Sequence, residues 1–570
     1  MFDIIVRGGK VVDGTGNPWF KADIGIKDGK IVELGRLEKE KADTVIDARG
    51  NVVSPGFVDM HSHSDLTLFI NPKLESTIHQ GITTLVVGNC GISLAPINKK
   101  HEHLLERYIA PFLPPGASIR FQWSTFEDYL RHENKQDLSS NVAHLVGHGT
   151  VRVAVMGFQD RAPSDVELEH MKYLVAEAME AGAFGMSTGL IYPPGIFSGT
   201  GELVEVAKVV SKYGGLYSSH VRGESSNLIY SIEEAIEIGE KSGVSVQISH
   251  HKVAGRQQIG KSVETLKLME DARKRGVDVA CDQYPYEAGM TSLATLLPPW
   301  VHEGGIDQLL ERIKRLEDRV KIRDDIEKDT TGWENIINEN GWENIYISNV
   351  KTEKNKDLQG KNIQEAARMM GKPDELTALL DLLVEEEGSG TMVVFVTKEE
   401  DVCKILSNPL TMVGTDSWST SPEGVLSAGK PHPRFYGTYP RILREYVRER
   451  SILSLEEAVR KMTSFPAQRL RLWGRGVIRE NMWADIVVFN PDTIMDTATY
   501  QNPHQYPEGI EYVIVNGEIV IDKRQQTQNY PGRVLRHKFP KKTFPHDGRI
   551  SLKGFEEVFS SQKDRDRLTL

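Results

Sequence analysis

The chain has 570 residues, and its 69 Lys and Arg against 80 Asp and Glu give a formal net charge of -11. Hydrophobic residues make up 39% and charged residues 26%, which is typical of a globular protein and not of a disordered or fibrous one. The acidic balance argues against a nucleic-acid partner, because phosphate binding needs a concentrated positive field. No apolar run approaches the ~18 to 20 residues that cross a bilayer, so we expect no membrane partner either.

The N-terminal sequence MFDIIVRGGKVVDGTG enters a strand pattern at once, with no basic leader or cleavage site. Only three cysteines occur, Cys90, Cys281 and Cys403, which is too few for a disulfide framework. These features predict a cytoplasmic protein and exclude a secreted mini-protein.

Both ends of the chain have the pattern of short β-strands separated by tight turns. Near the N-terminus these are FDIIVRGGKVVDG, ADIGIKDGKIVELG and DTVIDARGNVVSPG, and near the other end ADIVVFNP and YVIVNGEIVIDKR. Strand runs broken by DG or NG predict hairpins. We therefore expect residues 1–55 and 475–536 to form one small β-sandwich.

Between these ends, strand-like runs alternate with amphipathic helical stretches such as residues 164–182 and 227–243, each ending near a glycine. Eight alternations predict an α/β fold, a (β/α)8 TIM-type barrel over residues 56–474; an open doubly wound sheet is the alternative. The candidate strands are GFVDMHSHSD, TTLVVGNCG, NVAHLVGHGT, AFGMSTGL, GLYSSHV, SVQISHHK, VDVACDQYPY and TMVGTDS.

The connection between the seventh and eighth candidate strands is too long for a simple loop. It contains charged helical runs, for which solvated faces are the simplest interpretation. We expect its first part, residues 288–343, to form a lid over the barrel mouth. Residues 537–570 are predicted to be a C-terminal tail.

Polar residues that bind metal ions gather where the candidate strands end. His61 and His63 lie two apart, so both imidazoles face one side of the first strand. His220, His250 and Asp416 end the fifth, sixth and eighth strands, and active sites of such barrels lie at the C-terminal ends of the strands. Imidazole and carboxylate ligands favour zinc, although a related divalent ion also fits.

Cys90 follows the second candidate strand at the same rim, in a turn between Asn89 and Gly91. A buried cysteine is often a small hydrophobic residue, but a thiolate beside zinc is a strong ligand. We interpret Cys90 as a further ligand that joins two metal positions, and Cys281 and Cys403 as structural.

The ordered motifs PGFVDMHSHSD, GNCG, GHGTVR, FGMSTGLIYPPG, SSHVRGE, SHHK, DQYPY and MVGTDS resemble the amidohydrolase superfamily, and within it the N-acyl-D-amino-acid deacylases. This resemblance implies a tightly bound zinc at Cys90, His220 and His250, and a weaker second position near His61 and His63. Many superfamily members bridge two metals with a carboxylated lysine on the fourth strand; here that strand offers Met186, Ser187 and Thr188.

The resemblance also implies a mechanism and a substrate. Zinc lowers the pKa of bound water to about 7, and Asp416 acts as general base and then as general acid. Lys252, with Tyr192 and Tyr284, would bind the α-carboxylate of an N-acyl amino acid, and Ser292 would assist. Arg222, Glu224, His148 and His251 are expected to hold these groups in place.

Leu296, Leu297 and Trp300 in the predicted lid suggest a pocket for apolar side chains, such as those of D-leucine, D-methionine or D-phenylalanine. Several other functions stay open. They are a cyclic amidohydrolase of the hydantoinase or dihydroorotase kind, a deaminase that uses Glu224, a dipeptidase acting on a C-terminal D-residue, and an inactive scaffold that would bind no stoichiometric zinc.

Overall fold

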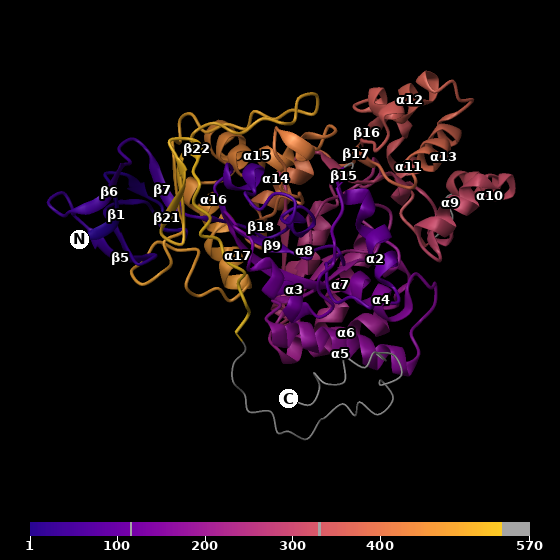
Figure 1. The fold of residues 1–570 in the computed structure, drawn as a ribbon, viewed down its shortest axis with the longest axis horizontal. Coiled ribbons are helices and arrows are strands. Elements are labelled where there is room, and N and C mark those ends of the chain that lie inside the picture. The colour runs from indigo at the N-terminus through magenta and orange to yellow at the C-terminus, as the bar shows by residue number, and fades with distance from the viewer. Residues whose placement is uncertain (115–116, 329–331, 539–570) are drawn as a thin grey trace. The chain divides into compact units, whose positions relative to one another are not determined.

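The computed structural model describes residues 1–114, 117–328 and 332–538 (Figure 1). Its centre is an eight-stranded sheet, and the neighbouring strands pair in parallel. The first and last strands meet through a bridge between Ser62 and Ser417, where the Asp416 N–H also donates to the His61 carbonyl at 2.7 Å. The sheet is therefore the expected barrel, and the open-sheet alternative is wrong. In order, its strands are β8 (Phe57–Asp59), β9 (Ile82–Val87), β10 (Asn141–Gly147), β11 (Gly185–Gly189), β12 (Leu216–His220), β13 (Ser245–Ile248), β14 (Val279–Gln283) and β18 (Thr411–Val413).

The predicted helices form where their local sequence starts and stops them. Ser164 and Glu167 make a capping box at the start of α5 (Asp165–Ala181), and Gly182 ends it at a φ of 110°. Gly243 ends α7 (Leu228–Ser242) in the same left-handed way. The other helices outside the insertion are α1 (Glu75–Ile78), α2 (Glu102–Ile109), α3 (Phe126–Glu133), α4 (His148–Met156), α6 (Thr200–Lys212), α8 (Ser262–Lys274), α14 (Glu399–Ser407), α15 (Arg434–Arg441), α16 (Leu455–Met462) and α17 (Ser464–Arg469).

Strands from both chain ends form two sheets around a common apolar core. The indigo and yellow strands of Figure 1 lie side by side. The joining contact is antiparallel pairing between β7 (Val52–Pro55) and β19 (Ile486–Phe489). One sheet has the order β5-β4-β1-β6, with β1 (Phe2–Arg7), β4 (Asp23–Lys27), β5 (Lys30–Gly35) and β6 (Ala42–Asp47). The other has the order β22-β21-β20-β19-β7-β2-β3, with β2 (Lys10–Val11), β3 (Phe20–Lys21), β20 (Ile510–Val515), β21 (Glu518–Asp522) and β22 (Gln525–Gln526).

The long connection between β14 and β18 folds around a hydrophobic core of its own. That core runs from Leu293 to Val394, so residues of the predicted lid share it with the segment that follows them. An antiparallel sheet of β15 (Ala288–Ser292), β17 (Thr391–Phe395) and β16 (Ile345–Asn349) carries the insertion. Its helices are α9 (Ile306–Lys314), α10 (Leu316–Glu327), α11 (Ile336–Asn340), α12 (Ile363–Met369) and α13 (Glu375–Glu385).

The sandwich packs directly on the barrel. Phe489 of β19 lies 6.4 Å, ring centre to ring centre, from Phe57 of β8, which stacks on Tyr439 at 5.3 Å. All three are buried in one cluster that contains residues of both domains. Within the described residues, no helix is long and apolar enough to cross a membrane. Of the predicted tail, only residues 537 and 538 belong to the described part of the chain.

Candidate metal centre

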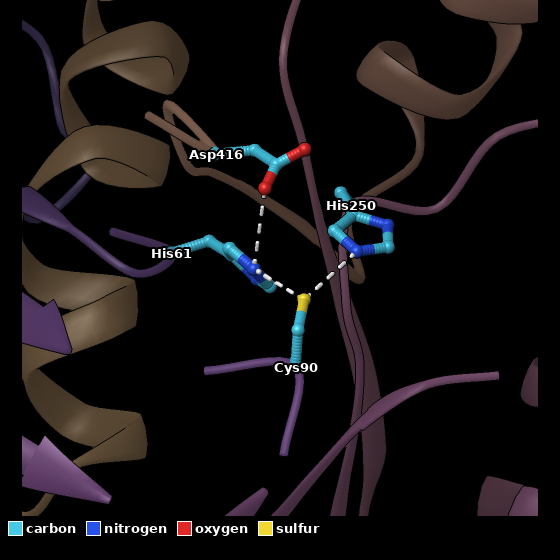
Figure 2. A group of neighbouring side chains, drawn as sticks. All are labelled: His61, Cys90, His250 and Asp416. Atoms are coloured by element: carbon cyan, nitrogen blue, oxygen red, sulfur yellow. Dashed lines mark hydrogen bonds and ion pairs between the residues drawn. The ribbon is translucent and has the colours of Figure 1, made fainter. Parts of the chain in front are cut away.

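Three of the predicted metal ligands and the predicted acid–base residue Asp416 converge at the C-terminal rim of the barrel (Figure 2). The Cys90 sulfur lies 3.3 Å from His61 Nε2 and 3.4 Å from His250 Nε2. His61 Nε2 in turn lies 3.6 Å from Asp416 Oδ1. These side chains come from the ends of four different strands, so only the closed barrel brings them together.

The remaining two predicted ligands lie beside this group. His220 places Nδ1 3.7 Å from the Cys90 sulfur, and His63 places Nε2 3.3 Å from Asp416 Oδ1. All six predicted metal and acid–base residues are therefore neighbours at one rim.

The chain turns sharply at three of these residues. Cys90, His250 and Asp416 have φ values of 52°, 34° and 51°, in the left-handed region that favours glycine. Such strain collects at functional sites, where the surrounding structure holds it in place. The side chains of all three residues point toward one another (Figure 2).

The electrostatics of the group are strongly coupled. Burial alone would raise the pKa of the Cys90 thiol, but the His61 and His250 imidazoles hold it well below its usual value. Burial would likewise raise the pKa of Asp416, and the Arg434 guanidinium and neighbouring imidazoles hold it well below. Both groups are thus kept in their anionic forms, which are the forms that bind a cation.

The donor set fits a zinc ion. Tetrahedral zinc with Zn–S of about 2.3 Å and Zn–N of about 2.0 to 2.1 Å sets sulfur and nitrogen about 3.6 Å apart. The distances from the Cys90 sulfur to the three imidazole nitrogens, 3.3, 3.4 and 3.7 Å, bracket that separation. A thiolate and three imidazoles are also donors that zinc prefers.

Two buried aspartates support the ligands from behind. Asp282 Oδ1 lies 3.3 Å from His61 Nδ1 and accepts a hydrogen bond from the backbone N–H of His250 at 2.7 Å. Asp59 accepts from the N–H and hydroxyl of Thr415, next to Asp416, at 2.8 and 2.7 Å. A carboxylate behind a ligating histidine fixes its ring and its tautomer. Asp282 lies in the DQYPY motif near the C-terminal end of β14, where active-site residues of such barrels are expected. Its role was nevertheless not predicted from the sequence.

Lys252 is buried at this rim and already has a partner. Its ammonium contacts Glu224 Oε1 at 2.6 Å, and the same oxygen lies 3.1 Å from His250 Nδ1. His220, Glu224 and His250 form a second group close enough to share a cation. In this structure the Lys252 ammonium contacts two members of this group, Glu224 and His250.

Arg434, at the start of α15, is the main site residue that the sequence did not reveal. Its guanidinium is 2% exposed, contacts Asp416 Oδ2 at 3.0 Å and stacks 4.5 Å above the Tyr284 ring. Its Nε and Nη1 donors have no hydrogen-bond partner among the described residues. Such donors are suited to a ligand oxygen. Because Arg434 follows a loop after β18, no strand position marks it.

Of the predicted substrate contacts, the two tyrosines lie beside residues of the centre, whereas Ser292 caps a turn. The Tyr284 ring lies under both Lys252 and Arg434, and Tyr192 packs on His220 while its hydroxyl lies 3.1 Å from that of Thr291. Ser292 instead accepts a hydrogen bond from the Ala294 N–H and caps the turn that follows.

The other predicted supporting residues have partners of their own. Arg222 pairs with Glu234 at 2.9 Å and not with Glu224, His148 pairs with Glu202 at 2.9 Å, and His251 lies 2.9 Å from the Thr265 hydroxyl. Cys281 is buried, and burial raises the pKa of its thiol to about 12; burial with the Glu399 carboxylate does the same for Cys403. Raised thiol pKa values agree with structural roles for both cysteines.

A cavity lies between the loop after β11 and the insertion, and Ile191 and Pro193, on either side of Tyr192 in the chain, line it. Of the residues suggested for a pocket wall, Leu297 lines this cavity, whereas Leu296 is fully buried in the core of the insertion and Trp300 packs against that core. Burial lowers the pKa of the lining His302 to about 4, which leaves it neutral. The lining residues are Ile191, Pro193, Ile196, Thr295, Leu297, Pro299, His302, Trp333, Glu334 and Ile336.

Comparison with known proteins gives consistent matches over almost the whole chain. A family model described as the amidohydrolase family matches residues 44–320 and 350–521. D-aminoacylase of Alcaligenes xylosoxydans xylosoxydans is 37% identical to this chain, and the match covers 94% of this chain and 97% of the relative. N-acyl-D-aspartate deacylase of the same organism is 35% identical, and the match covers 94% of this chain and 95% of the relative. A similar solved structure is that of N-acyl-D-glutamate deacylase from Bordetella bronchiseptica, complexed with zinc and a phosphonate mimic of the tetrahedral intermediate. Its sequence is 33% identical, its TM-score is 0.78, and the match covers 94% of this chain and 99% of that chain.

Proposed function

Because this chain belongs to the amidohydrolase family, we propose that it hydrolyses the amide bond of N-acyl-D-amino acids to a carboxylate and a free D-amino acid. The family resemblance seen in the sequence motifs is confirmed, and the protein is a metal-dependent amidohydrolase. One observation carries the choice of substrate: a thiol–imidazole centre shares its rim with two buried cations, Lys252 and Arg434.

We infer that the metal ion is zinc. Cys90, His220 and His250 would hold one ion tightly, and His61 with His63 would provide a weaker second position. When bound, zinc lowers the pKa of a water molecule and polarises the amide carbonyl. The spacing and chemistry of the donors support this ion, and the similar Bordetella enzyme was solved with zinc.

Asp416 is the proposed proton carrier. One of its oxygens faces His61 and His63, and the other is held by Arg434. Arg434 and the imidazoles keep the carboxylate ionised, so it is ready to accept a proton from water. It would then return that proton to the amine that leaves, as general acid.

The two cations would bind the α-carboxylate of the substrate. The unpartnered Nε and Nη1 of Arg434 and the ammonium of Lys252 lie on the same Tyr284 ring. A carboxylate between them would form charge-assisted hydrogen bonds. Tyr192 is a proposed contact on the His220 side, and Ser292 stays a prediction.

The cavity beside Tyr192 supports a preference for apolar side chains. Leu297, Ile191 and Ile196 line it. None of its described lining residues is a lysine or arginine that could pair with a D-aspartate or D-glutamate side chain. We therefore propose D-leucine, D-methionine and D-phenylalanine derivatives as the preferred substrates.

We also infer that the protein works in the cytoplasm. A catalytic ligand such as Cys90 must stay a reduced thiol, and the three cysteines of this chain are all free in the structure.

The deciding experiment compares amino-acid release from paired N-acetyl-D and N-acetyl-L substrates carrying Leu, Met, Phe or Glu. Zinc-loaded protein is measured beside its Asp416→Asn variant. We expect release from the D-series only, fastest for the apolar members, and its loss in the variant. Release from cyclic amides but not from either linear series would instead establish the cyclic amidohydrolase, and release only from peptides with a C-terminal D-residue would establish the dipeptidase.

A further inference from the structure

Glu224 touches two residues to which the proposed function gives different tasks. It follows β12 and is buried, and its Oε1 lies 2.6 Å from the Lys252 ammonium and 3.1 Å from His250 Nδ1. Lys252 belongs to the proposed carboxylate anchor, and His250 to the proposed metal ligands. A single carboxylate oxygen therefore lies between the two parts of the site.

The tautomer of His250 depends on this contact. His250 Nε2 faces the Cys90 sulfur at 3.4 Å, and it can donate a lone pair to an ion only if the ring proton sits on Nδ1. That proton then needs an acceptor, and Glu224 Oε1 is within reach. The carboxylate thus favours the tautomer in which Nε2 is free to bind.

Lys252 favours the opposite tautomer. Its ammonium also lies 2.8 Å from His250 Nδ1, and an ammonium can only donate. Left to itself, it would donate to a lone pair on Nδ1 and move the ring proton to Nε2, pointing at Cys90. Glu224 acts against this, because its Oε1 accepts from the Lys252 ammonium at 2.6 Å and offers the Nδ1–H an acceptor at 3.1 Å. The carboxylate and the ammonium therefore compete for His250 Nδ1, and the carboxylate favours the metal-binding tautomer.

The backbone of Glu224 is fixed on both sides. Its N–H donates to Glu334 Oε2 of the insertion at 3.2 Å, and its carbonyl accepts from the Ala254 N–H at 2.8 Å. The carboxylate therefore approaches Lys252 and His250 from a defined position.

We propose that Glu224 is a positioning residue that sets the tautomer of His250 and the position of Lys252, and so couples the metal centre to the substrate anchor. The anchor half of this inference rests on the proposed function, whereas the metal half does not.

The test measures zinc affinity by competition with a chelator, together with KM and kcat on an N-acetyl-D-amino acid. We expect Glu224→Gln to weaken zinc binding by about 10- to 100-fold, the usual effect of removing a carboxylate behind a ligating histidine, and to raise KM. Glu224→Asp keeps the charge and should recover part of both losses. Lys252→Met should raise KM while zinc affinity is retained, because the contact between Glu224 and His250 stays intact.

Glu234→Gln is the matched control. Glu234 is a buried carboxylate in an ion pair with Arg222, and its hydrogen bonds run to Arg222 and Thr200, away from the metal centre. Wild-type zinc affinity in Glu224→Gln, or an equal loss in Glu234→Gln, would overturn the proposal. If the wild-type protein hydrolyses no D-substrate, the proposed function fails, but zinc affinity still decides the role of Glu224.

Discussion

At the scale of single residues, backbone conformation and charge act together at the metal centre. Cys90, His250 and Asp416 each adopt a positive φ, which costs a non-glycine residue about 1 to 3 kcal/mol. A glycine would relieve the strain but would remove the side chain that the centre needs. The strain is therefore a cost of directing three functional groups from three strands to one point.

Arg434 gives the first prediction at this scale. In Arg434→Met, we expect kcat/KM to fall by about 10- to 100-fold, because a hydrogen bond to a charged group is worth about 1.5 to 3 kcal/mol. The Arg434 guanidinium lowers the pKa of Asp416 against the effect of burial, so its removal raises that pKa and moves the acidic limb of the rate profile to higher pH. The measurement is kcat/KM against pH. Arg441→Met, in the same helix but paired with Glu445, should leave the limb in place.

Cys90 gives the second prediction at the scale of single residues. We expect Cys90→Ser to lose its tightly bound zinc on gel filtration, because a serine hydroxyl stays neutral where the thiol becomes a thiolate. Cys281→Ser is the control, since that thiol contacts the Thr411 hydroxyl and none of the proposed ligands. Equal zinc content in Cys90→Ser and wild-type protein would rule out Cys90 as a main ligand.

At the scale of elements, the insertion joins the catalytic rim through a buried carboxyl group. Glu334 accepts a hydrogen bond from the Glu224 N–H and also lines the cavity beside Tyr192. Burial and the neighbouring Glu224 carboxylate raise the pKa of Glu334 to about 7. Protonation of Glu334 therefore favours the folded state, because it relieves the burial of a charge beside the Glu224 carboxylate.

The raised pKa of Glu334 predicts a pH dependence of stability. Because the pKa of Glu334 is raised on folding, protonated Glu334 contributes to the free energy of unfolding. This contribution is complete below about pH 4.5 and is lost as the pH rises through about 7. The change is about 3 kcal/mol, at about 1.4 kcal/mol per pKa unit. Glu334→Gln stays neutral, so we expect it to melt at a higher temperature than the wild type at pH 8 but not near pH 4.5. Glu311→Gln, an exposed change in α9, should not alter that difference. An equal shift of the melting temperature at both pH values would contradict this explanation.

The elements also show how far the sequence could be interpreted. Local periodicity, helix caps and glycine stops predict the helix that follows Ser164, the helix that ends before Gly243, and also the eight barrel strands. Because active sites of such barrels lie at the C-terminal ends of the strands, the sequence also groups His61, Cys90, His220, His250 and Asp416. The antiparallel sheet of the insertion was not predicted, because it pairs β15 with β17 across about a hundred residues. Arg434 was missed for a similar reason: its place beside Asp416 depends on how the loop after β18 returns.

At the scale of the whole molecule, the sandwich and the barrel share one buried cluster. Phe489 of β19 packs on Phe57, at the start of the strand that leads to His61 and His63. The two domains are therefore expected to unfold together.

We expect Phe489→Ala to lower the free energy of unfolding by about 3 to 5 kcal/mol, the usual cost of emptying a phenylalanine site in a core. Calorimetry should show a single transition moved to lower temperature, in the variant as in the wild type. A separate early transition, with zinc still bound by the remaining structure, would mean that the sandwich is an independent unit.

The pairing of β7 with β19 also has a consequence for synthesis. β7 leaves the ribosome long before β19, the strand at residues 486–489 that pairs with it, has been made. Until then the buried, apolar β7 has one unpaired edge, which makes a nascent chain prone to aggregation. We therefore expect the newly made protein to depend on chaperones during the interval before its two ends meet.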